Sequence, residues 1–192
     1  MKKKFTLAIL LAMLVSLTDC KSSDYKKAKE LAECGDYEGA AAAYQELGEY
    51  KDSEERALAL EHKVIEKQIE SLISQYQSFY DNFGPLSMSN YEAEMGRLEK
   101  IIDEFNQFKK ETDVSAYPDL QTYIVKVDAC NDGLLGIMEI DRDSMAQYYS
   151  PGFYMFGSSM ALSISSSEAV YSSMLRTLLN LEIPRATIEW LE

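Results

Sequence analysis

Apolar residues recur every three or four positions along most of this chain, which predicts a protein built from amphipathic helices. One apolar stripe, in a segment running from Asp52 to about Asn82, consists of Leu58, Ile65, Ile69, Leu72, Tyr76, Phe79 and Phe83. A second stripe ends near Lys110 and consists of Tyr91, Met95, Leu98, Ile102 and Phe105. Gly84-Pro85 separates the two stripes. We therefore expect two long helices joined by a short loop, which is an antiparallel helical hairpin.

Residues near the start of each long helix fit N-terminal caps, and the remaining chain continues the pattern. Asp52 with Glu55, and Ser89 with Glu92, have the spacing of helix caps. Pro118 is expected in the first turn of another helix, with apolar positions Leu120, Tyr123, Ile124 and Val127. The tripeptide 131–133, Asn-Asp-Gly, predicts a break before the next helix, which carries Leu135, Met138, Met145 and Tyr149.

The last part of the chain gives a weaker pattern. Residues 152–167 mix serine, glycine and aromatic residues without a period, so a loop, a short hairpin and a helix start all remain open. Helical spacing returns before Pro184 at Val170, Met174, Leu178 and Leu181. Ile188, Trp190 and Leu191 then predict a short apolar turn that docks on the body of the protein.

Small and aromatic residues dominate the segment from Tyr25 to Ala57. Its apolar positions fall on two helical faces, before and after Gly35-Asp36: Ala28, Leu31 and Ala32, then Tyr37, Ala40, Ala41, Tyr44 and Leu47. The alanines allow two helices to approach closely, and the tyrosines fill the space between them. We expect two short helices packed antiparallel.

This segment resembles one tetratricopeptide repeat. The matching positions are the small Ala28, the turn at Gly35, and Tyr37, Ala40 and Tyr44 of the second helix. The ending LGEYKDSEERA is similar to a repeat variant common in exported proteins of Gram-positive bacteria. Asp24 and Leu47 depart from the repeat pattern, and the closing proline is missing. Since a single repeat cannot bury both of its faces, we expect a later part of the chain to cover it.

The first twenty residues have the order of an export signal. Lys2 to Lys4 form a positive start, Phe5 to Val15 an apolar run too short for a permanent membrane span, and a short polar exit ends at Cys20. Leu17 and Cys20 resemble the cleavage box of bacterial lipoproteins, although Asp19 stands where that family usually has Gly, Ala or Ser. The resemblance implies that Cys20 becomes the lipid-bearing N-terminus. An ordinary secretory signal or an uncleaved anchor are the alternatives.

A strongly acidic composition narrows the range of partners. The chain carries a net charge of −13, and removal of residues 1–19 would take away three lysines and one aspartate. This balance argues against nucleic acid, whose binding depends on Lys and Arg, and against adsorption on anionic lipid headgroups. Retention at a membrane would therefore depend on the covalent anchor, for which two acyl chains suffice.

The two remaining cysteines leave a choice open. An exported compartment permits Cys34 and Cys130 to form a disulfide. The alternative, which we favour, is two buried thiols that act as small apolar residues.

Catalytic signatures are absent from the sequence. His62 is the sole histidine and lies on the seam of a predicted helix, so we interpret it as a packing residue. No lysine follows Lys126, which removes a Ser-x-x-Lys nucleophile among the C-terminal serines. The chain also lacks G-x-S-x-G, C-x-x-C and the dinucleotide fingerprint. We therefore expect a protein that is not an enzyme and needs no cofactor.

Residues 128–139 resemble a calcium-binding EF-hand loop. Asp128, Asp132, Gly133 and Glu139 occupy loop positions one, five, six and twelve. Cys130 replaces an oxygen ligand at position three. The alternative is a turn between helices with a solvated Glu139, and we commit to no metal site here.

Aromatic residues are frequent, with 13 Tyr and 7 Phe. Most fall on the predicted helical stripes and are assigned to the core. Those between residues 148 and 156 offer a candidate recognition surface, for which we name Tyr149, Phe153 and Tyr154.

Together these features predict an all-α protein with a tetratricopeptide-like helix pair, a long antiparallel hairpin and further packed helices. The expected divisions are a signal peptide at 1–19, the anchor cysteine and helix pair at 20–57, and a helical body at 58–192 that is either separate or continuous with the pair. The expected function is a lipid-anchored interaction or scaffolding module on the extracytoplasmic face of the cell membrane, with a protein or peptide partner. The alternative is a lipoprotein that binds a solute or an ion.

Overall fold

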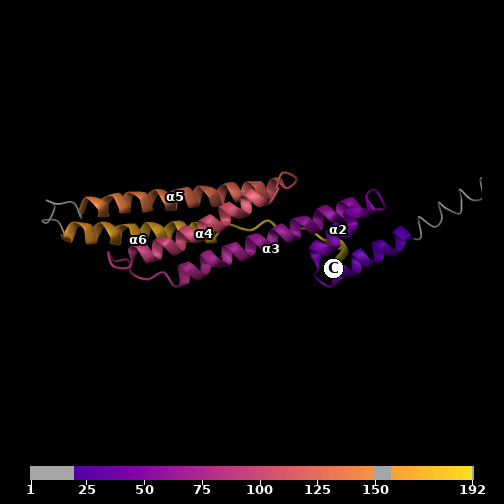
Figure 1. Ribbon diagram of the computed structural model, residues 1–192, viewed down its shortest axis with the longest axis horizontal. Helices are drawn as coiled ribbons and strands as arrows, with labels where there is room; N and C mark the ends of the chain where they lie inside the picture. The colour runs from indigo at the N-terminus through magenta and orange to yellow at the C-terminus, as the bar shows by residue number, and fades with distance from the viewer. Residues whose placement is uncertain (1–19, 149–156, 192) are drawn as a thin grey trace, which may run out of the picture. The chain divides into compact units, whose positions relative to one another are not determined.

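The computed structural model describes residues 20–148 and 157–191, and its elements are helices throughout (Figure 1). An unlabelled helix covers residues 20–33. The labelled helices are α2 (Tyr37–Leu47), α3 (Ser53–Asp81), α4 (Tyr91–Glu111), α5 (Pro118–Tyr148), α6 (Gly157–Leu179) and the short 3₁₀ helix η1 (Glu189–Leu191). The described ranges contain no strand. The predicted all-α class is confirmed.

Two compact units make up the described chain. The first runs to Lys67 and includes the chain again from Arg185 onward, and the second comprises Gln68–Pro184. The division thus falls inside α3, later than the boundary expected after residue 57. Among the helices in the described ranges, none combines the length and apolar character needed to cross a bilayer.

The core of the first unit is built from alanines and one tyrosine. Its buried residues are Ala28, Ala32, Ala40, Ala41, Tyr44, Leu47, Ala57 and Leu60. Gly35 makes the turn before α2 with a φ of +85°, a conformation that favours glycine. Asp36 then caps α2 by accepting a hydrogen bond of 3.0 Å from the Gly39 amide. The turn at Gly35-Asp36 therefore forms as the sequence predicts, whereas the first helix begins at residue 20, earlier than the expected Tyr25.

The C-terminal segment covers this alanine-rich core. Ile188, Trp190 and Leu191 pack against the core residues as partly buried side chains. The Tyr44 and Trp190 rings meet edge to face, with centroids 5.9 Å apart. The expectation that the end of the chain docks on the body is confirmed, and the docking site is the N-terminal helix pair.

The second unit buries the predicted face of α4 and most of the predicted face of α5. Tyr91, Met95, Leu98, Ile102 and Phe105 are all buried on α4. Pro118 begins α5, as predicted, and Leu120, Tyr123, Ile124 and Val127 are buried behind it. Helices α5 and α6 lie side by side (Figure 1).

The predicted break at residues 131–133 is wrong, because α5 continues through it without interruption. Asn131 is buried and its side-chain oxygen accepts a hydrogen bond of 2.9 Å from the Tyr76 hydroxyl. Gly133 leaves room for Met174 of α6, since a Cβ there would stand 2.1 Å from the Met174 methyl. Both turn-forming residues therefore have tertiary roles within a helix.

Three predicted apolar positions are exposed, and a neighbouring residue is buried in place of each. Leu58 is 49% exposed while Leu60 is buried. On α5, Leu134 is buried and the predicted Leu135 is exposed. On α6, Tyr171 is buried and the predicted Val170 is exposed. Helix α3 buries Ala57 and Leu60 in the first unit but Ile69, Tyr76 and Phe79 in the second, on different faces. A single stripe drawn along the whole helix therefore misplaces its beginning.

Two further expectations are corrected. Asn90 precedes the first residue of α4 in place of Ser89, and its side chain accepts hydrogen bonds from the amide and hydroxyl of Ser87. The cysteines are free thiols, and neither is buried: Cys34 is exposed and Cys130 is half-buried.

Candidate functional site

The residues named from the sequence as an interaction surface, Tyr149, Phe153 and Tyr154, lie outside the described residues. Cys20 is exposed and is already helical. The Lys21 ammonium donates a hydrogen bond of 3.4 Å to the carbonyl of Leu47, the last residue of α2. The expected attachment point therefore belongs directly to the first helix of the first unit, which begins at residue 20 and not at Tyr25.

The residues of the calcium-loop pattern do not form a loop. Asp128, Asp132 and Glu139 all lie within the continuous helix α5, and Asp128 accepts a hydrogen bond of 2.5 Å from the Lys109 ammonium. An EF-hand requires a loop that wraps several oxygen ligands around the ion. Within the described ranges, no group of three or more His, Cys, Asp or Glu side chains is arranged to hold a metal ion.

Residues of α3 and α4 line a concave surface, which we call the α3–α4 groove. It consists of two open hollows of about 380 and 450 Å³. The first is lined by Ser74, Gln75, Ser78, Phe79, Arg97, Lys100 and Ile101. The second is lined by Gln68, Ser71, Leu72, Glu104, Gln107, Phe108, Glu111 and Thr112. Both lie wholly within the second unit.

The α3–α4 groove combines a buried apolar floor with an exposed polar rim. Phe79, Ile101 and Phe108 are at most 9% exposed and form the floor, while serine and glutamine side chains form the rim. Cationic residues line the first hollow, where the Arg97 guanidinium lies 5.6 Å from the Phe79 ring centroid. Carboxylates line the second. The surface therefore offers shape and hydrogen-bonding side chains, while Arg97 and Lys100 are paired with Glu94 and Glu104 of the same helix.

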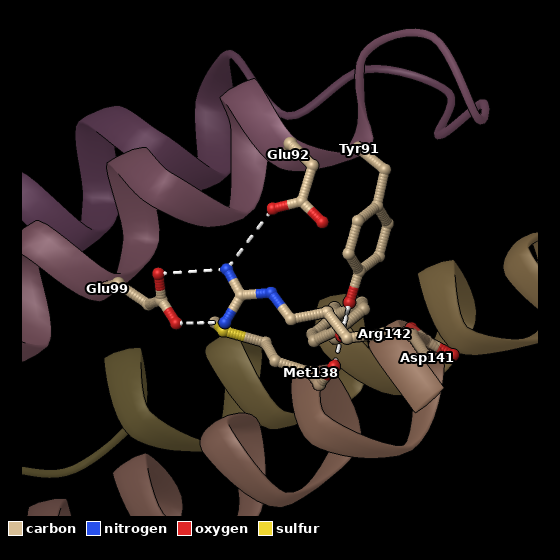
Figure 2. Close-up of polar contacts among 7 residues, drawn as sticks. Tyr91, Glu92, Glu99, Met138, Asp141 and Arg142 are labelled. Carbon is tan, nitrogen blue, oxygen red and sulfur yellow. Dashed lines mark hydrogen bonds and ion pairs between the residues drawn. The ribbon is translucent and has the colours of Figure 1, made fainter. Parts of the chain in front are cut away.

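A buried chain of hydroxyl groups holds α4 against α5 and α6. The Tyr91 and Tyr171 hydroxyls are 3.0 Å apart, and Tyr171 donates to the Asp141 carboxylate at 3.0 Å. Asp141, only 2% exposed, also accepts a hydrogen bond of 2.7 Å from Ser167. Because Tyr171 has a single hydroxyl proton and donates it to Asp141, Tyr91 must be the donor to Tyr171. The Tyr91 hydroxyl also lies 3.4 Å from the Met138 carbonyl (Figure 2).

This network keeps its protons over the ordinary range of pH. Burial raises the pKa of Tyr91 to about 12, against an ordinary value of 10.0. Burial also raises the pKa of Tyr171, and its hydrogen bonds to Tyr91 and Asp141 raise it further. Both tyrosines therefore act as fixed hydrogen-bond donors rather than as acids.

An ion pair adds a second connection between α4 and α5. Arg142 reaches from α5 to two carboxylates of α4 (Figure 2). It binds Glu99 through two parallel contacts of 2.5 and 3.0 Å and approaches Glu92 at 3.4 Å. The hydrogen bond from Arg142 lowers the pKa of Glu99, and the same contact raises the pKa of Arg142. As these side chains are about one-third exposed, the pair contributes about 1 kcal/mol or less.

The two connections fix the rotation of α4 about its axis. At about 100° per residue, Glu92 and Glu99 fall on one side of the buried stripe that begins at Tyr91, whereas Arg97 and Glu104 fall on the other side. The first side is bound to Arg142, and the second lines the groove. The network therefore holds the groove edge of α4 facing α3.

In the first unit, Asp52 joins three side chains that the sequence did not connect. Its carboxylate accepts a hydrogen bond of 2.5 Å from the Tyr25 hydroxyl and one of 2.9 Å from Arg56. The Arg56 guanidinium lies 4.1 Å from the Trp190 ring centroid. Burial and the hydrogen bond to Asp52 raise the pKa of Tyr25 to about 12. The sequence assigned Asp52 to the N-terminal cap of α3; its carboxylate is observed to bind Tyr25 and Arg56.

A fully buried carboxylate, Glu66, lies on α3 at the end of the first segment of the first unit. It accepts hydrogen bonds of 2.8 Å from Lys63, 2.7 Å from Arg185 and 3.0 Å from the Ala186 amide. Burial alone would raise the pKa of Glu66, but these three donors outweigh it and hold the pKa below its ordinary value. Two of the three donors come from the C-terminal segment.

Sequence reasoning missed Asp141 and Glu66 because acidic side chains are normally assigned to the surface. One signal was present: Asp141 follows Met138 by three residues and precedes Met145 by four, which places it on the buried face of α5. No family model, curated protein or solved structure matches this chain. The function is therefore argued from the residues and their geometry.

We predict that Tyr171→Phe lowers the free energy of unfolding by about 1–3 kcal/mol, because it removes a donor from the buried Asp141 and a partner from Tyr91. The matched control is Tyr80→Phe, whose exposed hydroxyl accepts a hydrogen bond of 3.1 Å from Arg176. That variant should lose less than about 0.5 kcal/mol. Denaturant unfolding followed by circular dichroism measures both, and equal losses would contradict a structural role for the network.

Proposed function

We propose that this chain is an exported lipoprotein, anchored through Cys20 at the extracytoplasmic face of the cell membrane, that acts without catalysis as an interaction or scaffolding module. The partner is a protein or peptide that binds in the α3–α4 groove. The groove is the observation that carries the interaction, since it is an extended surface with an apolar floor and short polar side chains at its rim. Such grooves suit an amphipathic helix laid along them.

The finer architecture belongs to the same proposal. Residues 20–57 form a tetratricopeptide-like pair, and α3 with α4 forms an antiparallel hairpin. The lining of the groove supports the hairpin: residues 74–79 of α3 share a hollow with residues 97–101 of α4, and residues 68–72 share one with residues 104–112. Residue numbers therefore run in opposite directions along the two helices, as they do in an antiparallel pair.

The anchor rests on the pattern of the first twenty residues. A positive start, a short apolar run and Leu17 three positions before Cys20 support lipid attachment at that cysteine. The net charge of −13 supports the need for a covalent anchor, because an acidic protein is repelled by anionic headgroups. As residue 20 is already helical, the first unit would sit close to the lipid.

A solute-binding lipoprotein is the second candidate. The hollows of about 380 and 450 Å³ fall within the size range of small-molecule sites. Both are open and largely rimmed by exposed polar residues, which favours a polypeptide over a small apolar molecule. A solute that co-purifies with the chain would reverse this preference.

We predict that Ser78→Trp blocks the groove and weakens partner binding at least about tenfold, which corresponds to 1.4 kcal/mol. The matched control is Ser173→Trp, an exposed serine of α6 that does not line the groove. Capture of envelope proteins on a fragment from Lys21 to Glu192 measures the effect. A partner retained equally by both variants would contradict the groove as the binding surface.

We also predict that fatty-acid labelling of the protein disappears in Cys20→Ser, because no other residue would carry the lipid. Cys34→Ser is the control, since Cys34 is an exposed thiol that should not be acylated. Labelling that persists in Cys20→Ser, or that is lost in Cys34→Ser, would reject the anchor.

A further inference from the structure

The segment from Arg185 to Leu191, which we call the tail, lies on the N-terminal helix pair in the manner of a bound peptide. Its residues are half-buried or exposed, and η1 contains no buried residue. Apart from η1, the tail has no regular secondary structure. It is therefore held largely by side-chain contacts with the surface beneath it.

One end of the tail is held by Glu66. The carboxylate accepts the Arg185 guanidinium at 2.7 Å and the Ala186 backbone amide at 3.0 Å. A side chain that accepts a backbone amide together with the preceding cation recognises an extended chain as well as a particular residue. Because Glu66 is fully buried in this arrangement, loss of the tail would leave its charge with Lys63 as the remaining described donor.

The other end is held by Arg56 and the aromatic residues around it. Trp190 stacks on the Arg56 guanidinium at 4.1 Å and meets the Tyr44 ring edge to face. Asp52 accepts a hydrogen bond of 2.9 Å from Arg56 Nε and so helps to fix the guanidinium. Between the two ends, Ile188 packs on the alanine-rich core. The surface thus contacts three side chains of the tail: the cation Arg185, the aliphatic Ile188 three positions later, and Trp190 two positions after that.

We propose that this surface of the first unit is a peptide-binding site whose resident occupant is the chain's own tail. A partner protein would displace the tail with an extended segment of the same chemistry: Arg, then an aliphatic residue at the third following position and Trp at the fifth. The tail competes at an effective concentration in the millimolar range, so the partner must add contacts of its own. The tail of a second copy of this chain would make the same contacts as the resident tail and no additional ones. We therefore favour a different protein as the partner.

This site extends the proposed function as an interaction module but uses the first unit, whereas the α3–α4 groove belongs to the second. A peptide titration and groove-dependent capture can therefore fail independently of each other.

The test uses Trp190, the single tryptophan of the chain. In full-length Trp190→Ala the protein contains no tryptophan, so a peptide with the sequence of residues 182–192 reports its own binding through its emission. We expect a saturable blue shift, weakened at least about tenfold by adding Glu66→Gln or Arg56→Ala. A peptide with Arg185 replaced by Glu is the matched control. Its affinity for Trp190→Ala should be no higher than the affinity of the original peptide for the Glu66→Gln or Arg56→Ala variants.

A second measurement covers the case in which Trp190→Ala does not fold, as judged by circular dichroism. Wild-type protein labelled with 5-fluorotryptophan, which enters only at Trp190, is then titrated with the unlabelled peptide of residues 182–192. Displacement of the tail shifts the fluorine resonance of Trp190 toward that of a solvent-exposed indole. Absence of a shift at millimolar peptide overturns the proposal. So does binding to folded Trp190→Ala that neither Glu66→Gln nor Arg56→Ala weakens. A wild-type dimer that Arg56→Ala dissociates would overturn the choice of a different protein as partner.

Discussion

The first unit depends on a charge that is removed from water. Glu66 is fully buried, and a buried carboxylate is tolerated only when it is paired and hydrogen-bonded. Lys63 supplies one donor from the same helix, but Arg185 and Ala186 come from the far end of the sequence. The constraint therefore ties residues 185 and 186 to α3. The tail then packs Ile188 and Trp190 against the alanine-rich core of the first unit.

The second unit also contains a buried carboxylate, and its hydrogen-bond donors are neutral hydroxyl groups. Asp141 is buried within it and is satisfied by Tyr171 and Ser167, while Arg142 beside it binds α4 at a partly exposed edge. These polar contacts specify how α4 is rotated, and apolar packing fills the space around them. The consequence is that one edge of α4 is left to line an open groove with α3. In both units, buried polar groups position the surfaces that we propose for binding.

Local sequence predicts the helices well because capping and periodicity act over a few residues. Pro118 begins a helix and the turn before Tyr37 forms as expected. Tertiary contacts decide the rest. Asn131 and Gly133 look like a turn, yet a hydrogen bond from Tyr76 and the close approach of Met174 keep them helical. The groove and the tail site arise from contacts between different elements, so no local pattern reveals them. Glu66 and Asp141 are buried, although acidic residues are normally assigned to the surface.

Amide hydrogen exchange in the full-length chain tests most directly whether the tail closes the N-terminal helix pair. Wild-type protein is compared with Trp190→Ala, and amides 120–134 of α5 serve as the internal reference. We predict that amides between residues 28 and 47 exchange at least about tenfold faster in the variant, because loss of the stacking on Arg56 lowers the local opening free energy. The reference amides should be unchanged. Equal protection of residues 28–47 in both proteins would contradict the account.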